Sequence, residues 1–288
     1  MRETVRMQPR RRWGDGAASL ACARMPGHFE TETAITRTGD HTWTAEISPE
    51  WNINDNANGG YLLTPALRAA RELTDHPDPL TVTTHFFRPG RGNHPAEIHA
   101  EVLKAGRTMS TASATLVQEG KPRLTMIAGF GDVETAPRHD AGWSIPMPDL
   151  PPPDECIDRT ALGQGVTVAL NGRNEIRVDP RSLETPGHDA SAEMLGWARF
   201  RDGTDPSAIA LPFFADAFPP TVFNRLGAIG WVPTLELTVH VRRRPRPGWL
   251  ACQVWTDDLH NGTLIESVRI WDANGDLVAQ GRQLGLLL

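Results

Sequence analysis

The order of predicted secondary-structure elements occurs twice along this chain. Residues 58–132 read as a helix, a strand, an Arg-Pro segment and three more strands, and residues 216–288 repeat that order. The matching segments are PLTVTTHFFRPG at 79–90 with VPTLELTVHVRRRP at 232–245, and EGKPRLTMIAGFG at 119–131 with ANGDLVAQGRQLG at 273–285. Two copies are too few for a solenoid. The pattern therefore favours an internal pseudo-dimer with a ligand cleft at its interface, the plainer alternative being a simple duplicated domain.

The composition excludes several classes of protein. A chain of 288 residues with 39% hydrophobic and 22% charged residues can bury a substantial core. The formal net charge of −6 argues against a nucleic-acid partner. No apolar run approaches the roughly 18 residues that span a bilayer. The three scattered cysteines form neither a disulfide framework nor a Cys-x-x-Cys metal site, so we expect a cytoplasmic protein.

Changes in composition divide the chain into four segments. Residues 1–26 begin with five arginines and one glutamate in twelve positions, which predicts a basic disordered leader. Residues 27–135 form the first unit. Residues 136–163 form a proline-rich linker, with six prolines in 136–153 and no helical or strand period up to that point. Residues 164–288 form the second unit.

Each unit is expected to contain one long helix. In the first, apolar residues recur at three- and four-residue spacing from Leu62 to Leu73, after Asn58 as the helix cap and Gly59 and Gly60 as the opening residues. In the second, we expect the helix to begin directly after Asp216. Its first turn would contain Pro219 and Pro220, where proline is tolerated.

Alternating apolar residues predict the strands around these helices. A hairpin is expected over 29–47 with its turn at 38–40. In the second unit the predicted strands are GVTVAL at 165–170, NEIRVDP at 174–180, AEMLGWARF at 192–200, TLELTVHV at 234–241, WLACQVW at 249–255, TLIESVRIW at 263–271 and DLVAQGRQL at 276–284. A long helix against an antiparallel sheet is an α+β architecture.

Three polar residues of the second unit are candidates for a site. Asp216 before a helix would be stabilised as the anion by free amides and the helix dipole, although an ordinary N-cap is an equal alternative. Thr234 opens a strand and shares its polar face with Glu236, as any β-forming threonine could. Gln283 shares a strand face with the small residues Ala279 and Gly281, and by itself it reads as a surface glutamine.

These motifs resemble acyl-CoA thioesterase II and the double-hotdog acyl-CoA thioesterase-like family. The similarity is carried by NGGYLLTPALRAARE and HFFRPG in the first unit, and by ADAFPP, VPTLELTVHVRRRP and VAQGRQ in the second. It implies a tandem double hotdog, each unit a long helix wrapped by an antiparallel β-sheet. It also implies that Asp216, Thr234 and Gln283 are the catalytic residues.

The resemblance implies hydrolysis of acyl-CoA thioesters by a water that Asp216, Thr234 and Gln283 hold, without a covalent enzyme intermediate. The Gly59 and Gly60 amides, after Asn58, would stabilise the oxyanion. Arg242, in a basic run, would bind coenzyme A phosphates, although a solvated edge is the commoner role. The family's histidine-bearing segment is changed here, so no role passes to His85. The spacing from Thr234 to the following proline is one residue longer than in the family.

Other chemistries lack their motifs. The sequence contains no Gly-x-Ser-x-Gly elbow, dinucleotide or phosphate-binding loop, or metal-ligand histidine spacing, so we expect no cofactor and no metal. The alternatives to a thioesterase are a non-catalytic acyl-CoA or lipid-binding hotdog protein and, less favoured, an enoyl-CoA hydratase. An exposed edge of the combined sheet could recruit a second copy, which makes a homo-oligomer one expectation.

Overall fold

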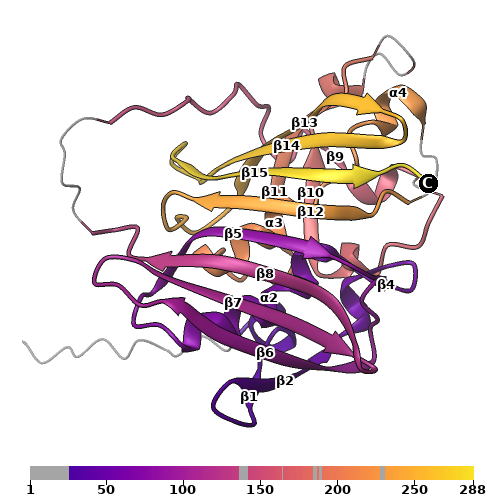
Figure 1. The fold of residues 1–288 in the computed structure, drawn as a ribbon. Helices are drawn as coiled ribbons and strands as arrows, with labels where there is room; N and C mark the ends of the chain where they lie inside the picture. The colour runs from indigo at the N-terminus through magenta and orange to yellow at the C-terminus, as the bar shows by residue number, and fades with distance from the viewer. Residues whose placement is uncertain (1–25, 136–141, 164, 184–186, 188–189, 228–230) are drawn as a thin grey trace, which may run out of the picture.

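The computed structural model describes residues 26–135, 142–163, 165–183, 187, 190–227 and 231–288. Its main feature is one antiparallel sheet of 13 strands in the order β1-β2-β6-β7-β8-β5-β12-β15-β14-β13-β11-β10-β9 (Figure 1). A sheet with helices on one side confirms the α+β class. The predicted leader, apart from Pro26, lies outside the described residues.

The strands of the first half are β1 (Thr36–Arg37), β2 (Thr42–Ile47), the short pair β3 (Asn52–Ile53) and β4 (Asn56–Ala57), β5 (Asp78–Phe86), β6 (His94–Lys104), β7 (Ser110–Gln118) and β8 (Lys121–Gly131). Those of the second half are β9 (Ile157–Asp158), β10 (Asn174–Val178), β11 (Glu193–Phe200), β12 (Thr234–Val241), β13 (Leu250–His260), β14 (Thr263–Trp271) and β15 (Leu277–Leu286). The α-helices are α1 (His28–Glu32), α2 (Gly59–Glu72), α3 (Leu211–Ala215) and α4 (Phe223–Leu226).

The strand order repeats in the two halves. Counted outward from the centre of the sheet, the first half runs β5, β8, β7, β6, β2, and the second runs β12, β15, β14, β13, β11. The halves join where β5 pairs antiparallel with β12, with Val82 opposite Val239. Threonine hydroxyls of Thr83 and Thr238 lie 3.0 Å apart across this seam. The duplication seen in the sequence is therefore present in the topology.

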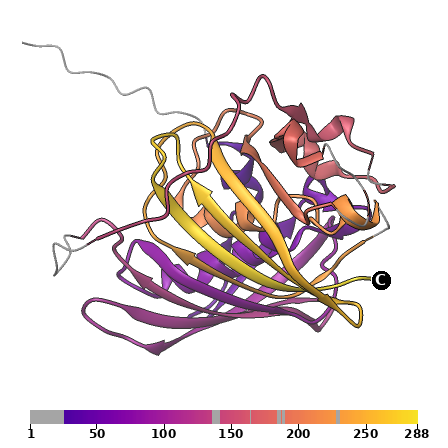
Figure 2. The ribbon, with the colours of Figure 1, turned by 90° about the horizontal axis from the view of Figure 1, so that it is seen from above.

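Helix α2 forms as the sequence predicts. The Asn58 side chain accepts a hydrogen bond from the amide of Tyr61 and so caps the first turn. Residues 60–67 are all buried, because α2 packs against β6, β7 and β8 on one side and α3 on another. In Figure 2 the sheet curves around the helical segments, which lie on its inner side. This position brings the N-terminus of α2 to the boundary between the halves.

The long helix predicted after Asp216 is wrong. Helix α3 has only five residues and ends at Ala215, before the aspartate, and α4 has four residues. Pro219 and Pro220 have no amide hydrogen to donate, and proline disfavours the helical conformation of the preceding residue. The two prolines therefore separate α3 from α4, where the sequence analysis placed them inside a first turn.

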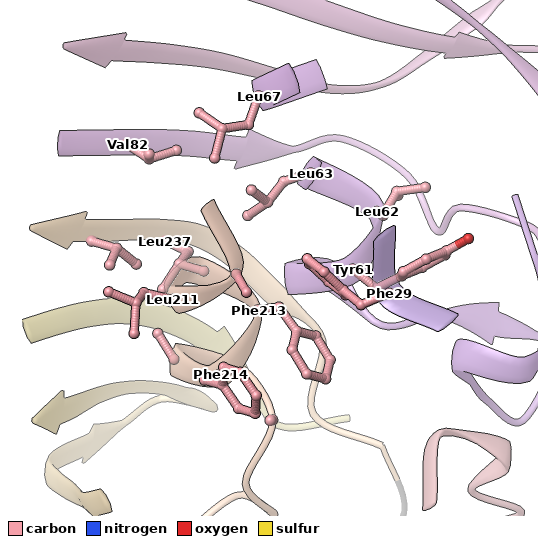
Figure 3. Packing of buried hydrophobic residues seen from close by; sticks show 14 of the residues in the cluster. Phe29, Tyr61, Leu62, Leu63, Leu67, Val82, Leu211, Phe213, Phe214 and Leu237 are labelled. Atoms are coloured by element: carbon pink, nitrogen blue, oxygen red, sulfur yellow. The ribbon is translucent and has the colours of Figure 1, made fainter. Parts of the chain in front are cut away.

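One core serves both halves. Phe29, Trp51 and Tyr61 from the first half pack with Phe200 and Phe213 from the second, and the ring centroids of Phe29 and Phe200 lie 4.9 Å apart. Figure 3 shows leucines of α2 facing residues of α3 and β12 in the same way. The two halves therefore share one continuous hydrophobic cluster.

Three smaller predictions differ from the structure. The hairpin over 29–47 is present as β1 and β2, but its first residues form helix α1, which buries Phe29. Residues 165–170 form no strand among the named elements, and their end is a 3₁₀ helix, Ala169–Gly172. The segment predicted as a linker contains β9, which pairs with β10 at the sheet edge.

Candidate functional site

Asp216 is held by the beginning of helix α2. Its Oδ2 atom accepts hydrogen bonds of 2.9 Å from the Gly60 amide and 2.9 Å from Nδ2 of Asn58, which also donates to the Asp216 carbonyl. Asp216 itself is the C-terminal cap residue of α3. A helix N-terminus was predicted beside this carboxylate, and the one that lies there belongs to the other half of the chain.

The two glycines allow this close approach. A Cβ atom on Gly60 would lie 2.8 Å from the Phe213 Cα and 3.0 Å from the Asp216 Cβ. A Cβ on Gly59 would lie 3.0 Å from Asp216 Oδ2 and 3.2 Å from the Phe86 ring. A contact as short as that at Gly60 is not seen for real Cβ atoms, so packing requires glycine there, whereas the contacts at Gly59 are tight but involve only side chains.

Thr234 reaches the site through a β-bulge. The pairing of β12 with β15 shifts between Thr234 and Glu236, which adds one residue to β12. The bulge turns Thr234 to the inner side of the sheet, whereas regular alternation had placed it on the outer face with Glu236. Its Oγ1 lies 2.7 Å from Oε1 of Gln283 and 3.3 Å from Oδ1 of Asp216.

Gln283 extends this hydrogen-bonded chain into the sheet. Its Nε2 donates a 2.8 Å hydrogen bond to Oε1 of Glu266, which lies opposite Gln283 in the β14–β15 ladder. Glu266 is 4% exposed, and its Oε2 accepts from the amide and hydroxyl of Thr221. Asp216, Thr234, Gln283 and Glu266 therefore form one continuous polar chain.

Burial and neighbouring charge raise the pKa of Asp216. Desolvation is the main cause and Glu266 adds to it, while the hydrogen bonds from Gly60, Thr234 and Asn58 act in the opposite direction, and the resulting pKa is about 6. Burial also raises the pKa of Glu266. Asp216 is thus a stronger base than an exposed aspartate and still mostly ionised at neutral pH.

A mostly apolar cavity of about 240 Å³ opens beside Asp216 and Thr234. Its other walls come from the loop before α2, the end of β5 with the following loop, and residues 231–235, with Leu62, Phe86, Trp231, Val232 and Leu235 among them. Arg88 lies at its exposed side and bonds to the carbonyl of Pro122. The cavity can hold a small apolar group with a carbonyl beside Asp216.

The structure gathers six of the seven predicted site residues here: Asn58, Gly59, Gly60, Asp216, Thr234 and Gln283. Arg242 lies elsewhere, because it follows the far end of β12, eight residues from Thr234 and about 26 Å along the strand. The Gly60 amide is already bonded to Asp216. Among the described residues the Gly59 amide has no acceptor, so it is the remaining candidate oxyanion donor.

The other end of the β5–β12 seam has a different character. There Arg244 donates two 2.9 Å hydrogen bonds to Asp78, and Arg68 pairs with Glu30 at 2.5 Å. These ion pairs occupy the position related to the cavity by the internal repeat. The end of the seam at Thr234 therefore combines an apolar cavity with a partly buried carboxylate, whereas the end at Arg244 contains ion pairs.

Sequence reasoning missed Glu266 and Arg88. The signal for Glu266 is the alternation of β14, in which Glu266 falls on the buried face with Leu264, Val268 and Ile270. A glutamate on an apolar strand face is rarely buried without partners. Arg88 stands in the HFFRPG segment, and nothing in that segment alone indicates which end of the sheet it reaches.

The parts of the chain that are described contain no group of three or more His, Cys, Asp or Glu side chains that could hold a metal ion. None of their helices has the length and apolar character needed to cross a membrane.

Two family models match consecutive parts of this chain. The model of the acyl-CoA thioesterase N-terminal domain matches residues 47–131, and that of the acyl-CoA thioesterase C-terminal domain matches residues 148–287. The crystal structure of "a putative thioesterase II" from Thermobifida fusca is 32% identical, with a TM-score of 0.81, covering 91% of this chain and 98% of that one.

Two further relatives are more distant. A protein with a hot dog fold from Alicyclobacillus acidocaldarius is 21% identical with a TM-score of 0.77, covering 90% of this chain and 97% of that one, which shows a shared fold. An uncharacterized protein of Mycobacterium tuberculosis is 25% identical over 267 residues, covering 84% of this chain and 89% of its own length.

Proposed function

The chain belongs to the acyl-CoA thioesterase family, and from this premise we propose that it hydrolyses acyl-CoA thioesters to a free acid and coenzyme A. One observation carries the proposal: Asp216, Thr234 and Gln283 are linked by hydrogen bonds, and Asp216 and Thr234 line an apolar cavity. A general base beside a site for an acyl group is what thioester hydrolysis requires.

In the proposed reaction Asp216 is the general base. A water beside Oδ1 of Asp216 and the Thr234–Gln283 pair attacks the thioester carbonyl carbon, and its proton passes to Asp216. The carbon–sulfur bond then breaks, and the proton leaves Asp216 with the coenzyme A thiolate. The free amide of Gly59 supports the oxyanion from the N-terminus of α2.

We propose a small acyl group as the substrate. A cavity of about 240 Å³ is below the roughly 300 Å³ at which pockets for drug-sized ligands begin, and a cavity of about 150 Å³ already accepts benzene. Short aliphatic and benzoyl-sized acyl groups fit such a volume. Long chains would require Leu62 or Trp231 to move.

Arg88 is proposed as the coenzyme A contact in place of Arg242. Arg88 lies at the cavity, and no acidic side chain among the described residues pairs with it. A guanidinium in this position suits a phosphate. Arg242, at the far end of β12, is too distant for a ligand whose acyl group lies beside Asp216.

We also propose that the halves are two hotdog units, the second with a shortened helix. The repeated strand order and the central β5–β12 pairing support this. Homo-oligomer formation and a cytoplasmic location remain predictions from the sequence.

The proposal is tested with a chromogenic thiol reagent and a panel of acyl-CoAs from acetyl to palmitoyl, including benzoyl. We expect thiol release with the short acyl groups. Asp216→Asn should lower kcat by about 10²- to 10⁴-fold, the usual contribution of a general base. Tight acyl-CoA binding without any turnover would reject hydrolysis in favour of a binding protein, and loss of an enoyl double bond would indicate a hydratase.

A further inference from the structure

Glu266 is a buried carboxylate directly behind the proposed site. It lies in the middle of three neighbouring strands, opposite Thr256 of β13 on one side and Gln283 of β15 on the other. All three side chains point to the inner face of the sheet, and Glu266 is 4% exposed. A carboxylate in this position needs hydrogen-bond donors, because burial without them is costly.

In the described residues, each hydrogen-bond partner of the Glu266 carboxyl group is a donor. Oε2 accepts from the Thr221 amide at 2.8 Å, the Thr221 hydroxyl at 2.9 Å and the Thr256 hydroxyl at 3.5 Å. Oε1 accepts from Nε2 of Gln283 at 2.8 Å. Both oxygens of Glu266 therefore act as acceptors, and the amide nitrogen of Gln283 faces Glu266.

This contact decides which end of the Gln283 amide faces the site. With Nε2 turned to Glu266, the carbonyl oxygen Oε1 is turned to Thr234 at 2.7 Å. An attacking water points its lone pair at the substrate and its two hydrogens at the protein. It therefore needs acceptors around it, and the reversed amide would present a donor.

We propose that Glu266 is a positioning residue that keeps the Gln283 carbonyl turned towards Thr234 and the reacting water. The inference rests on the proposed hydrolysis, since the water belongs to that reaction. Glu266 touches neither the cavity nor the substrate and acts through Gln283.

Glu266 also acts on Asp216 by its charge. Its carboxylate disfavours a second negative charge nearby and so raises the pKa of Asp216. Burial of Asp216 is the larger cause of that increase. The other groups around Asp216 in the described residues are the uncharged Asn58, Gly60 amide, Thr234 and Gln283, with the cation Arg88 at the cavity. Arg282, the neighbour of Gln283 in β15, is opposite Ser267 in the ladder, is exposed and lies 4.0 Å from Asp257.

Two variants separate the hydrogen bond from the charge. Glu266→Gln keeps the size but lets a neutral amide donate to Gln283 Oε1, so Gln283 can reverse. We expect kcat to fall roughly tenfold, the effect of one misplaced hydrogen bond, with little change in KM. The acid limb of the kcat/KM profile should move to lower pH, because the charge is gone.

Glu266→Asp keeps the charge but withdraws it from Gln283, so kcat should fall while the acid limb stays in place. Glu236→Gln is the matched control, since Glu236 is a half-buried glutamate of β12 that bonds to Thr238 outside the polar chain. That variant should match the wild type in kcat and in pH profile. A merely structural role for Glu266 would lower stability in both variants without moving the acid limb in Glu266→Gln.

The side-chain amide signal of Gln283 in ¹⁵N-glutamine-labelled protein gives a readout independent of turnover. It should shift in Glu266→Gln and stay unchanged in Glu236→Gln. If the wild type hydrolyses acyl-CoA and Glu266→Gln keeps its kcat, acid limb and amide signal, the inference is overturned. If the wild type hydrolyses no acyl-CoA but the amide signal shifts, the contact stands and the proposed function is the part that fails.

Discussion

The amide of Gly60 and the carboxylate of Asp216 are 156 residues apart in the sequence and joined by a 2.9 Å hydrogen bond. Because Gly60 lies in the first turn of α2 and Asp216 follows α3, this bond ties the two halves of the chain together at the proposed site. It also places the next free amide, that of Gly59, beside the base. The proposed base and the proposed oxyanion donor thus share one helix end.

The raised pKa of Asp216 predicts the pH dependence of the reaction. A general base must be ionised, and the pKa of Asp216 is about 6, so kcat/KM should level off above pH 7. Below about pH 6 it should fall tenfold per pH unit. Initial rates in buffers from pH 4.5 to 8.5 measure this, and a limb near pH 4 would mean that Asp216 is not buried in this way.

The same shift predicts that Asp216→Asn stabilises the fold. Burial raises the pKa of Asp216 in the folded state from its usual 3.8 to about 6. The folded protein then holds this proton more tightly than the unfolded chain, so a stabilising contribution present below pH 3.8 is lost as the pH rises through 6.

Above pH 6 the ionised Asp216 is therefore unfavourable for folding, and asparagine removes that cost while keeping the shape. We expect a gain of about 1 to 2 kcal/mol at pH 7.5, below the ~3 kcal/mol of the full shift because the side chain is partly open to the cavity. At pH 4 the gain should nearly vanish. Urea unfolding at both pH values measures it, and equal gains at pH 4 and pH 7.5 would contradict this account.

Alanine at Gly59 and at Gly60 should have different effects. At Gly60 the new Cβ meets the backbone of Phe213 at 2.8 Å, and a shift there should cost about 1 to 3 kcal/mol of stability. At Gly59 it meets only the side chains of Asp216 and Phe86. Stability should then change little while kcat falls, because Asp216 is displaced.

Denaturant unfolding and initial rates on both glycine variants make this comparison. A Gly59→Ala protein with wild-type kcat would show that the added Cβ does not displace Asp216. A Gly60→Ala protein as stable as the wild type would show that α2 and α3 can separate without cost.

Arg88 and Arg242 form a matched pair for testing the coenzyme A contact. Arg88→Ala should raise KM for acyl-CoA about 3- to 10-fold with kcat unchanged, since a charge-assisted bond to phosphate is lost. Arg242→Ala should leave KM as it is, because that residue follows the opposite end of β12. With an acyl thioester that lacks phosphates, the two variants should behave alike, and equal KM values for acyl-CoA would exclude Arg88.

The strands were readable from the sequence because their signal is local. TLELTVHV and TLIESVRIW match β12 and β14 residue for residue, since alternation depends only on neighbouring positions. The cap at Asn58 was equally local. The repeat of the two units followed from these elements, and the topology confirms it.

The prediction of a long second helix was wrong because the local sequence fits two different structures. Proline is tolerated at the start of a helix and also ends one, and Pro219 and Pro220 fit either position. The choice depends on α3, which packs Phe213 and Phe214 into the shared core before Asp216. Core packing outweighed the first-turn preference.

Alternation, capping and the candidate residues Asp216, Thr234 and Gln283 could thus be read directly from the chain, because short-range geometry and a family motif carry them. Their arrangement could not be read in this way. A single bulge in β12 moved Thr234 across the sheet, and the register of β14 with β15 placed Glu266 behind Gln283. Such contacts join residues far apart in sequence, and strand register and helix packing, which no local pattern encodes, set their distances.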